Sequence, residues 1–131
     1  MKNGFLKPKN SPPDSYRGRL GRRGEDLAAA FFALQGFEVV ERNWRCRIGE
    51  IDLIVRRGQD FRFVEVKMRR THAFGYPEAS VTPRKLRHLQ GTMETWLKLH
   101  PPRPKTYQVD VLAISWLKGA DKPCIEWIQG V

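Results

Sequence analysis

The sequence predicts an α/β domain in which a mixed β-sheet is flanked by helices, with the element order αβββαβ. Apolar residues recur at helical spacing in two segments, one before Gly36 and one after Thr82. Three runs rich in β-branched and aromatic residues lie between these segments, and further runs of this kind follow the second segment. Both faces of the central strands are partly apolar, which is typical of a sheet covered on both sides. A chain of 131 residues is the length of one domain with its own core.

The first helix follows a run of arginines. Its apolar stripe consists of Leu20, Leu27, Ala28, Phe31, Phe32 and Leu34. Gly36 is suited to end this helix, because glycine readily adopts the left-handed conformation found just after helices. Residues 1–16 are basic, contain several prolines and have little to bury. We therefore expect a disordered basic tail at residues 1–16 and a single domain over residues 17–131.

The strands are expected at residues 37–44, 48–55 and 61–68, with a hairpin turn at residues 57–60. A loop over residues 69–81 leads to the second helix, which Thr82 caps and Pro83 begins. Pro101 and Pro102 end that helix. A fourth strand is expected at residues 107–116, and a fifth at residues 125–128 that pairs with it at an edge of the sheet.

The chain is strongly basic. It has 24 Lys and Arg against 14 Asp and Glu, a net charge of +10. Such a surface attracts polyanions, and nucleic acid is the commonest polyanionic partner. No apolar run approaches the length of a membrane span, so we expect no membrane association. The isolated Cys46 and Cys124 are typical of unpaired thiols in a reducing cytoplasm, and the spacing of Cys and His does not suit a structural zinc site.

Two apolar runs carry the residues with the most distinctive chemistry. The first contains Asp52, and the second contains Glu65 and Lys67. Side chains alternate along a strand, so Glu65 and Lys67 are expected on one face. If the two runs are neighbouring strands, Asp52 lies beside Glu65, and the group could hold a divalent cation against a phosphodiester. The alternative is a half-exposed strand with a solvated ion pair, although burying unpaired carboxylates is costly and asks for a reason.

Of three further acids, two have two interpretations each, and the third is left out of the site. Glu25 is either an acid favoured by the helix dipole or a ligand reaching across to the sheet. Asp110 either supports the site from behind or pairs with an arginine. Glu50 is expected on the strand face opposite to Asp52 and is left out of the site.

Basic and aromatic residues near these acids are candidates for nucleic-acid contacts. The candidate contacts are Arg22, Arg69, Arg70, Tyr76, Arg84 and Lys85. Lys85 lies in the first turn of the second helix, where cations and backbone N–H groups suit a phosphate, although a solvated helix face is the ordinary alternative. A loop aromatic such as Tyr76 more often packs locally. The four tryptophans, Trp44, Trp96, Trp116 and Trp127, are expected to pack in the core or at the sheet edge.

The element order and several motifs together resemble the restriction-endonuclease-like fold of the PD-(D/E)xK superfamily. Within it, the chain is most similar to the bacterial YraN family of endonucleases, small relatives of archaeal Holliday-junction resolvases. The resemblance covers about residues 18 to 116. Its motifs are Gly21-x-x-Gly24-Glu25, Asn43-x-Arg45, Gly49-Glu50-Ile51-Asp52, Val64-Glu65-Val66-Lys67-x-Arg69, Val81-x-x-x-Lys85 and Val109-Asp110-Val111. The sequence departs from the nominal signature at Ile51, where a proline would precede Asp52.

The resemblance implies a metal-dependent DNA endonuclease that acts on branched or otherwise irregular DNA and leaves a 5′-phosphate. Asp52, Glu65 and the carbonyl of Val66 would bind Mg²⁺ or Mn²⁺, which favour oxygen ligands. Lys67 would position the attacking water. Burial would lower the pKa of Lys67, and the neighbouring carboxylates would oppose this lowering. Glu25 would complete the catalytic set. Symmetric cutting would need a homodimer, and a further protein partner could direct it. The alternatives are a nucleic-acid-binding module without catalysis and an RNA-cleaving nuclease of the same fold.

Overall fold

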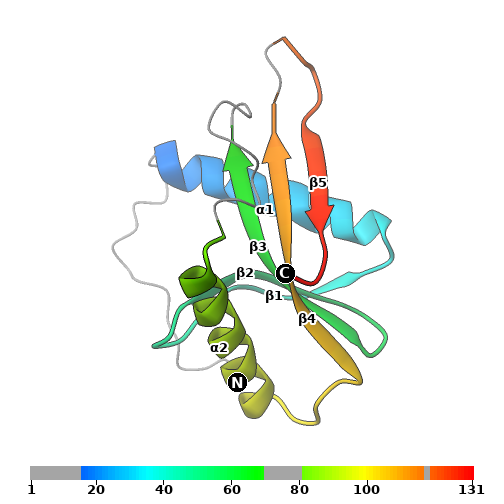
Figure 1. Ribbon diagram of the computed structural model, residues 1–131. Helices are drawn as coiled ribbons and strands as arrows, with labels where there is room; N and C mark the ends of the chain where they lie inside the picture. The colour runs from blue at the N-terminus through cyan, green and yellow to red at the C-terminus, as the bar shows by residue number, and fades with distance from the viewer. Residues whose placement is uncertain (1–15, 70–80, 117–118) are drawn as a thin grey trace.

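The computed structural model describes residues 16–69, 81–116 and 119–131, with side chains from residue 22 onward. One five-stranded sheet runs in the order β1-β2-β3-β4-β5. The helices α1 and α2 lie on opposite faces of this sheet (Figure 1). The elements are α1 Tyr16–Leu34, β1 Glu38–Arg45, β2 Glu50–Arg57, β3 Asp60–Arg69, α2 Pro83–Leu99, β4 Thr106–Ser115 and β5 Cys124–Ile128. The predicted fold class is confirmed.

The sheet is mixed, as the sequence predicts. Neighbouring strands are antiparallel except β3 and β4, which are parallel from Asp60↔Thr106 to Arg69↔Ser115. Parallel neighbours need a crossover connection, and α2 lies in that connection. The predicted fifth strand pairs with β4 at the edge. In the described part of the chain, no helix is long and apolar enough to cross a membrane.

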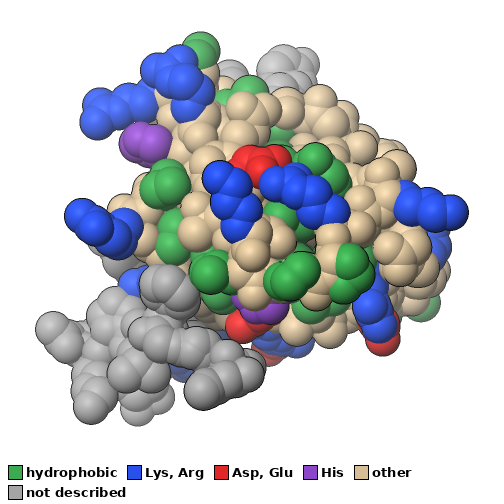
Figure 2. Space-filling view, turned by 90° about the horizontal axis from the view of Figure 1, so that it is seen from below, with side chains coloured by type: hydrophobic (Ala, Val, Ile, Leu, Met, Phe, Trp, Pro, Cys, Tyr) green, Lys and Arg blue, Asp and Glu red, His purple; other side chains and the backbone are tan. Residues whose placement is uncertain are grey.

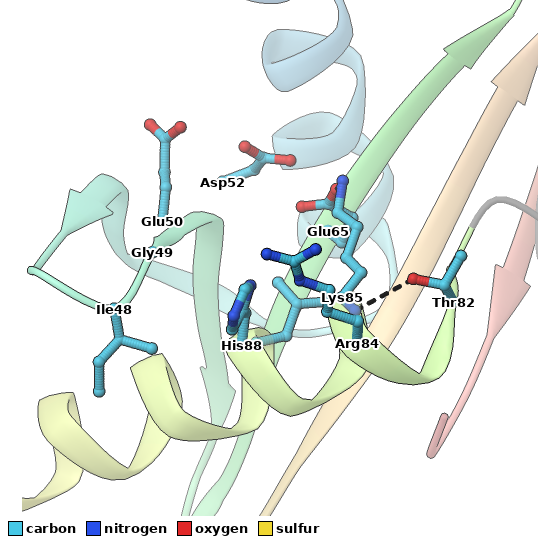
Figure 3. A pocket seen from close by; sticks show the side chains of 10 residues that line it. Ile48, Gly49, Glu50, Asp52, Glu65, Thr82, Arg84, Lys85 and His88 are labelled. Carbon is cyan, nitrogen blue, oxygen red and sulfur yellow. Dashed lines mark hydrogen bonds and ion pairs between the residues drawn. The ribbon is translucent and has the colours of Figure 1, made fainter.

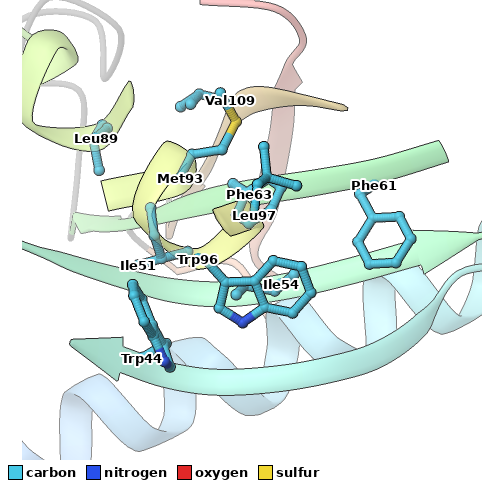
Figure 4. Packing of buried hydrophobic residues seen from close by; sticks show 10 residues of the cluster. All are labelled: Trp44, Ile51, Ile54, Phe61, Phe63, Leu89, Met93, Trp96, Leu97 and Val109. Carbon is cyan, nitrogen blue, oxygen red and sulfur yellow. The ribbon is translucent and has the colours of Figure 1, made fainter. Parts of the chain in front are cut away.

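Each helix buries an apolar stripe against its own face of the sheet. On the α2 side, Trp96 packs with its ring centroid 5.8 Å from that of Phe61 and 5.5 Å from that of Phe63 (Figure 4). On the α1 side, Phe32 packs edge-on against Phe37 and Trp127. Each large apolar side chain buried in this way contributes about 1.5–3 kcal/mol. The expectation that tryptophans pack in the core is therefore confirmed for Trp96, which is 4% exposed.

Helix ends follow the predicted signals. The Thr82 side chain accepts a hydrogen bond from the Lys85 N–H at 3.1 Å, and Pro83 begins α2. Gly36 has φ +88°, and its N–H donates to Ala33 at the end of α1. The strands are displaced from the expected ranges by one or two residues, which is common at element ends. Tyr16, expected in the tail, begins α1, and the rest of the expected tail lies outside the described residues.

Asp110 forms a buried ion pair rather than a support for the acidic site. It is 0% exposed and lies on the α1 side of β4. Its carboxylate accepts hydrogen bonds from Arg62 and from Trp127 Nε1, both at 2.9 Å. It also accepts from Gln108 Nε2 at 2.8 Å and from the Gly130 N–H at 2.9 Å. Of the two interpretations of Asp110, the arginine partner is confirmed, and the pair fastens the C-terminal segment to the sheet.

We expect Asp110→Ala to lower the free energy of unfolding by about 3–5 kcal/mol, because it leaves the Arg62 charge and several donors buried without an acceptor. Urea unfolding followed by far-UV circular dichroism measures the change. The exposed Asp121 provides the control, and Asp121→Ala should shift stability by about 0.5 kcal/mol or less. Equal stability of the two variants would contradict this account of the ion pair.

Candidate active site

Strands β2 and β3 separate at the place where the acidic residues lie. Their pairing runs from Arg57↔Asp60 to Leu53↔Val64 and goes no further, although β2 begins at Glu50 and β3 continues to Arg69. The Val66 N–H faces this opening and donates to Asp52 Oδ2 at 2.8 Å. A residue's C=O points to the same edge of a strand as its N–H, so the Val66 carbonyl also faces the opening. The Asp52 side chain thus replaces the backbone acceptor that a paired β2 strand would offer to the Val66 N–H.

The opening forms one wall of a pocket of about 500 Å³ between the sheet and α2. Asp52 and Glu65 both line it, and Lys85 reaches Glu65 from α2 (Figure 3). The full lining is Ile48, Gly49, Glu50, Asp52, Glu65, Thr82, Arg84, Lys85, His88 and Leu89. The predicted approach of Asp52 to Glu65 is confirmed, because the two carboxyls interact directly.

Two ammonium groups meet on one oxygen of Glu65. Lys67 Nζ lies 3.1 Å and Lys85 Nζ lies 2.7 Å from Glu65 Oε2. The Glu65 side chain is only 9% exposed, so these charges interact in a poorly solvated place. The shared face of Glu65 and Lys67 is therefore as predicted. The solvated helix face considered for Lys85 is not what the structure has, because Lys85 is an ion-pair partner of Glu65.

The two carboxyls are driven to opposite protonation states. Burial and, after it, the negative charges of Glu65 and Glu50 together raise the pKa of Asp52 to about 8, against the opposing hydrogen bond from the Val66 N–H. Burial also acts to raise the pKa of Glu65, but Lys85 and Lys67 outweigh it and the net pKa is lowered. At neutral pH, Glu65 is therefore ionised while Asp52 holds its proton.

The two lysines are shifted in opposite directions. Burial lowers the pKa of Lys67, the positive charge of Lys85 adds to that effect, and the opposing Glu65 does not cancel it. Of the two opposing effects expected on the pKa of Lys67, burial therefore prevails. Burial also acts to lower the pKa of Lys85, but its contact with Glu65 prevails and the net pKa is raised.

Excluding Glu50 from the site was wrong. Glu50 lines the pocket, and its charge raises the pKa of Asp52. Residues two apart in a strand share a face, so the alternation rule itself places Glu50 with Asp52. Its carboxylate accepts a hydrogen bond from Arg45 at 2.9 Å, which holds it at the pocket rim. His88 also lines the pocket, and its position one turn after Lys85 in the predicted helix could have indicated this.

Glu25 lies outside the pocket wall, although it approaches the site indirectly. It accepts a hydrogen bond from Asn43 Nδ2 at 2.8 Å. Asn43 falls between the pairs Arg42↔Leu53 and Trp44↔Ile51, which places it across from Asp52. Its φ of +52° is uncommon for a residue other than glycine, though asparagine tolerates it better than most. A catalytic role for Glu25 stays a prediction.

The candidate nucleic-acid contacts are spread over several elements. Arg84 and Lys85 line the pocket, and Arg69 ends β3. Arg22 is exposed on α1 and lines a second hollow that shares no lining residue with the pocket of Asp52 and Glu65. Residues Arg70 and Tyr76 lie outside the described residues. Figure 2 shows Lys and Arg side chains at several places on one face, near its centre as well as around its outline.

The described residues provide two neighbouring carboxylates rather than a closed metal cage. Within residues 16–69, 81–116 and 119–131, no three Asp, Glu, His or Cys side chains are grouped so as to hold a metal ion. Mg²⁺ commonly binds through one or two carboxylates, with water and substrate phosphate completing its coordination. Asp52, Glu65 and the Val66 carbonyl match that requirement in donor chemistry.

The raised pKa of Asp52 predicts a pH-dependent stability difference. An unfolded aspartate titrates near pH 4, so the folded protein holds the Asp52 proton more tightly than the unfolded chain does. The stability that this proton provides is complete below about pH 4 and is lost as pH rises to about 8. Asp52→Asn has no carboxyl to ionise, so the variant does not lose stability in this way. We expect the stability of the variant relative to wild type to increase by about 1–3 kcal/mol between pH 5 and pH 8 in urea unfolding. A difference that is constant over this range, as expected for the exposed control Asp121→Asn, would contradict the shift.

Comparison with known proteins places the whole core in one family. Residues 24–114 match the family described as "Uncharacterised protein family UPF0102". A UPF0102 protein of Streptomyces griseus is 48% identical over 99 residues, which cover 75% of this chain and 83% of the relative. One from Arthrobacter is 41% identical over 112 residues, covering 86% and 94%, and one from Geobacter sulfurreducens is 43% identical over 109 residues, covering 83% and 84%.

The matched region contains β1 to β3, α2 and all but the last residue of β4, together with the three carboxylates that line the pocket. It also lies within residues 18 to 116, the span that resembles the YraN family, and the activity that this resemblance implies stays a prediction. From the family match and the identities with these relatives, the chain belongs to the UPF0102 family.

Proposed function

We propose that this protein is a metal-dependent endonuclease that hydrolyses phosphodiester bonds in DNA. The observation that carries the proposal is the grouping of Asp52, Glu65 and Lys67 where β2 leaves β3. A protein that only binds nucleic acid has no need for two adjacent, poorly solvated carboxyls facing a basic pocket. Burial, followed by the negative charge of Glu65, raises the pKa of Asp52, and a divalent cation would stabilise the ionised carboxylate that both effects disfavour.

The donor chemistry fits Mg²⁺ or Mn²⁺. Asp52, Glu65 and the Val66 carbonyl would hold the ion, since hard cations favour carboxylate, carbonyl and water oxygens. When bound, it would polarise the phosphate and make the bound water a better nucleophile. Asp52 must lose its proton to act as a ligand, so metal binding should release a proton and strengthen as pH rises.

The protein's own groups would orient the reaction. Lys67 lies beside Glu65, where its ammonium group could hold the attacking water and balance charge on the phosphate. Arg84 and His88 line the same pocket and could contact the phosphates on either side of the cleaved bond. The net charge of +10 would draw nucleic acid toward this surface.

The proposed substrate is branched or irregular DNA, by resemblance alone. Symmetric cutting of a four-way junction would require two copies of the chain. A cytoplasmic location, a homodimer and a directing protein partner stay predictions.

A nucleic-acid-binding module without catalysis is the second candidate function. One observation favours it: Lys67 and Lys85 already neutralise Glu65 without a metal ion. RNA cleavage would use the same chemistry as DNA cleavage, so matched DNA and RNA substrates are needed to separate the two.

We expect Glu65→Gln to reduce cleavage by about 10²- to 10³-fold while binding of DNA stays equal or becomes tighter, because a negative charge is lost. Labelled single-stranded, duplex, flap and four-way-junction DNA, with matched RNA, would be incubated with Mg²⁺, Mn²⁺ or EDTA. Glu94→Gln is the matched control, since Glu94 lies on α2 outside the pocket lining and pairs with Arg103. Cleavage by Glu65→Gln at the wild-type rate would remove Glu65 from the mechanism. Binding without cleavage by wild type under every condition would favour the binding module.

Binding of DNA should weaken steeply with salt, because cationic contacts release counterions from the phosphates. With about four phosphate contacts, we expect the logarithm of affinity to fall with the logarithm of salt concentration at a slope of about −3 to −4. Fluorescence anisotropy in EDTA between 50 and 300 mM KCl would measure this slope. An affinity that does not change with salt would show that the basic surface does not carry the binding.

A further inference from the structure

The proposed reaction gives Lys67 a role but leaves the position of Lys85 unexplained. Both ammonium groups contact Oε2 of Glu65, at 3.1 Å and 2.7 Å. Lys67 is two residues from Glu65 on the same strand face, so the backbone keeps it there. Lys85 reaches the same oxygen from the first turn of another element, α2 (Figure 3). Two positively charged groups thus contact a single carboxylate, although one of them would balance its charge.

Lys85 is the more exposed of the two lysines that contact Glu65. Its side chain is 39% exposed, against 21% for Lys67. Lys85 lines the pocket, whereas Lys67 is absent from its lining. Its backbone N–H is held by the Thr82 side chain at 3.1 Å. Rotation of its flexible four-carbon stem would therefore carry the ammonium group into the pocket while the helix stays in place.

A cation bound by Glu65 would compete with Lys85. Both need the electron pairs of the same poorly solvated carboxylate, and two positive charges on either side of it repel each other. Once released, the Lys85 ammonium would lie in a pocket that Arg84 and His88 also line. Several cationic or polar donors in one pocket suit an anionic phosphate.

We propose that Lys85 is a metal-gated phosphate contact: it occupies Glu65 in the metal-free protein, and filling of the metal site releases it to the substrate. The proposal rests on the proposed function for its substrate, but the competition at Glu65 can be tested without any cleavage. Lys85 would thus couple the two binding events, because the metal ion frees the group that holds the phosphate.

The first test is binding of Mn²⁺ alone, measured by isothermal titration calorimetry in wild type, Lys85→Gln and Lys98→Gln. Lys98 is an exposed lysine in the last turn of α2, so its variant controls for loss of one positive charge. We expect Lys85→Gln to bind Mn²⁺ about three- to tenfold tighter than Lys98→Gln does. Lys85→Arg should bind Mn²⁺ no tighter than wild type, because arginine can hold a carboxylate through two hydrogen bonds.

The second test is binding of four-way-junction DNA in EDTA and in Ca²⁺, an oxygen-seeking cation. We expect Lys85→Gln to weaken binding about three- to tenfold in Ca²⁺ and less than about twofold in EDTA. In EDTA, Lys85 stays on Glu65 and contributes little to the phosphate. Lys98→Gln should have the same effect in both conditions.

The outcomes separate this proposal from the nuclease assignment. If Lys85→Gln and Lys98→Gln bind Mn²⁺ equally, or the loss of DNA affinity is the same in EDTA and Ca²⁺, the gating is overturned even where wild type cleaves DNA. If both differences appear but no substrate is cleaved, the gating stands and the endonuclease proposal fails. If wild type binds no Mn²⁺, both are overturned.

Discussion

The separation of β2 from β3 is the constraint on which the rest of the site depends. A continuous hairpin would satisfy its backbone groups internally and leave no room between the strands. Here the pairing ends at Leu53↔Val64, and the Asp52 carboxyl takes over as acceptor for the Val66 N–H. The same side chain therefore stabilises the opening and faces the pocket. Substitution at Asp52 affects both shape and chemistry, whereas Glu65 carries no such backbone contact among the interactions described.

Burial and charge act together to give two adjacent acids different states. Burial and two acidic neighbours raise the pKa of Asp52 despite the hydrogen bond from the Val66 N–H, so Asp52 retains its proton. Glu65 forms ion pairs with two lysines, so it stays ionised although it is buried. The group as a whole is compensated without a metal ion, which explains how a stable fold can tolerate it. On the other face of the sheet, the buried charge of Asp110 is compensated by its ion pair with Arg62 and by further hydrogen bonds.

Local patterns predicted the elements and the central acids, because strand alternation and helix capping are short-range properties. The neighbouring positions of Asp52 and Glu65 follow from the hairpin between them. Glu50 obeys the same alternation, which places it two residues before Asp52 on the face that lines the pocket. Alternation itself also has a limit here, since Ile51 and Ile54 are three residues apart yet pack in the same cluster on the α2 side. Such an irregularity depends on tertiary packing, which sequence periodicity does not report.

Other features depend on how distant elements are placed. The contact between Lys85 and Glu65 exists because α2 crosses the sheet with its first turn above the opening. The choice between two interpretations of Asp110 required knowing that Arg62 lies on the same face of the sheet. Neither relation is encoded in the spacing of residues along one element. Charge composition predicted a polyanionic partner but could not show which cations surround the pocket.

The parallel pairing of β3 with β4 has a consequence for how the site comes into being. Asp60 and Thr106, which begin this pairing, are 46 residues apart in the chain and are hydrogen-bonded in the fold. Closing a loop of this length costs conformational entropy before the strand contacts that offset this cost can form. Such non-local pairings therefore form more slowly than helices or hairpins. The β2–β3 hairpin can bring Asp52 near Glu65 early, but Lys85 arrives only with the crossover. A nascent chain therefore brings its two acids together with Lys67 alone, before Lys85 adds the second counter-charge.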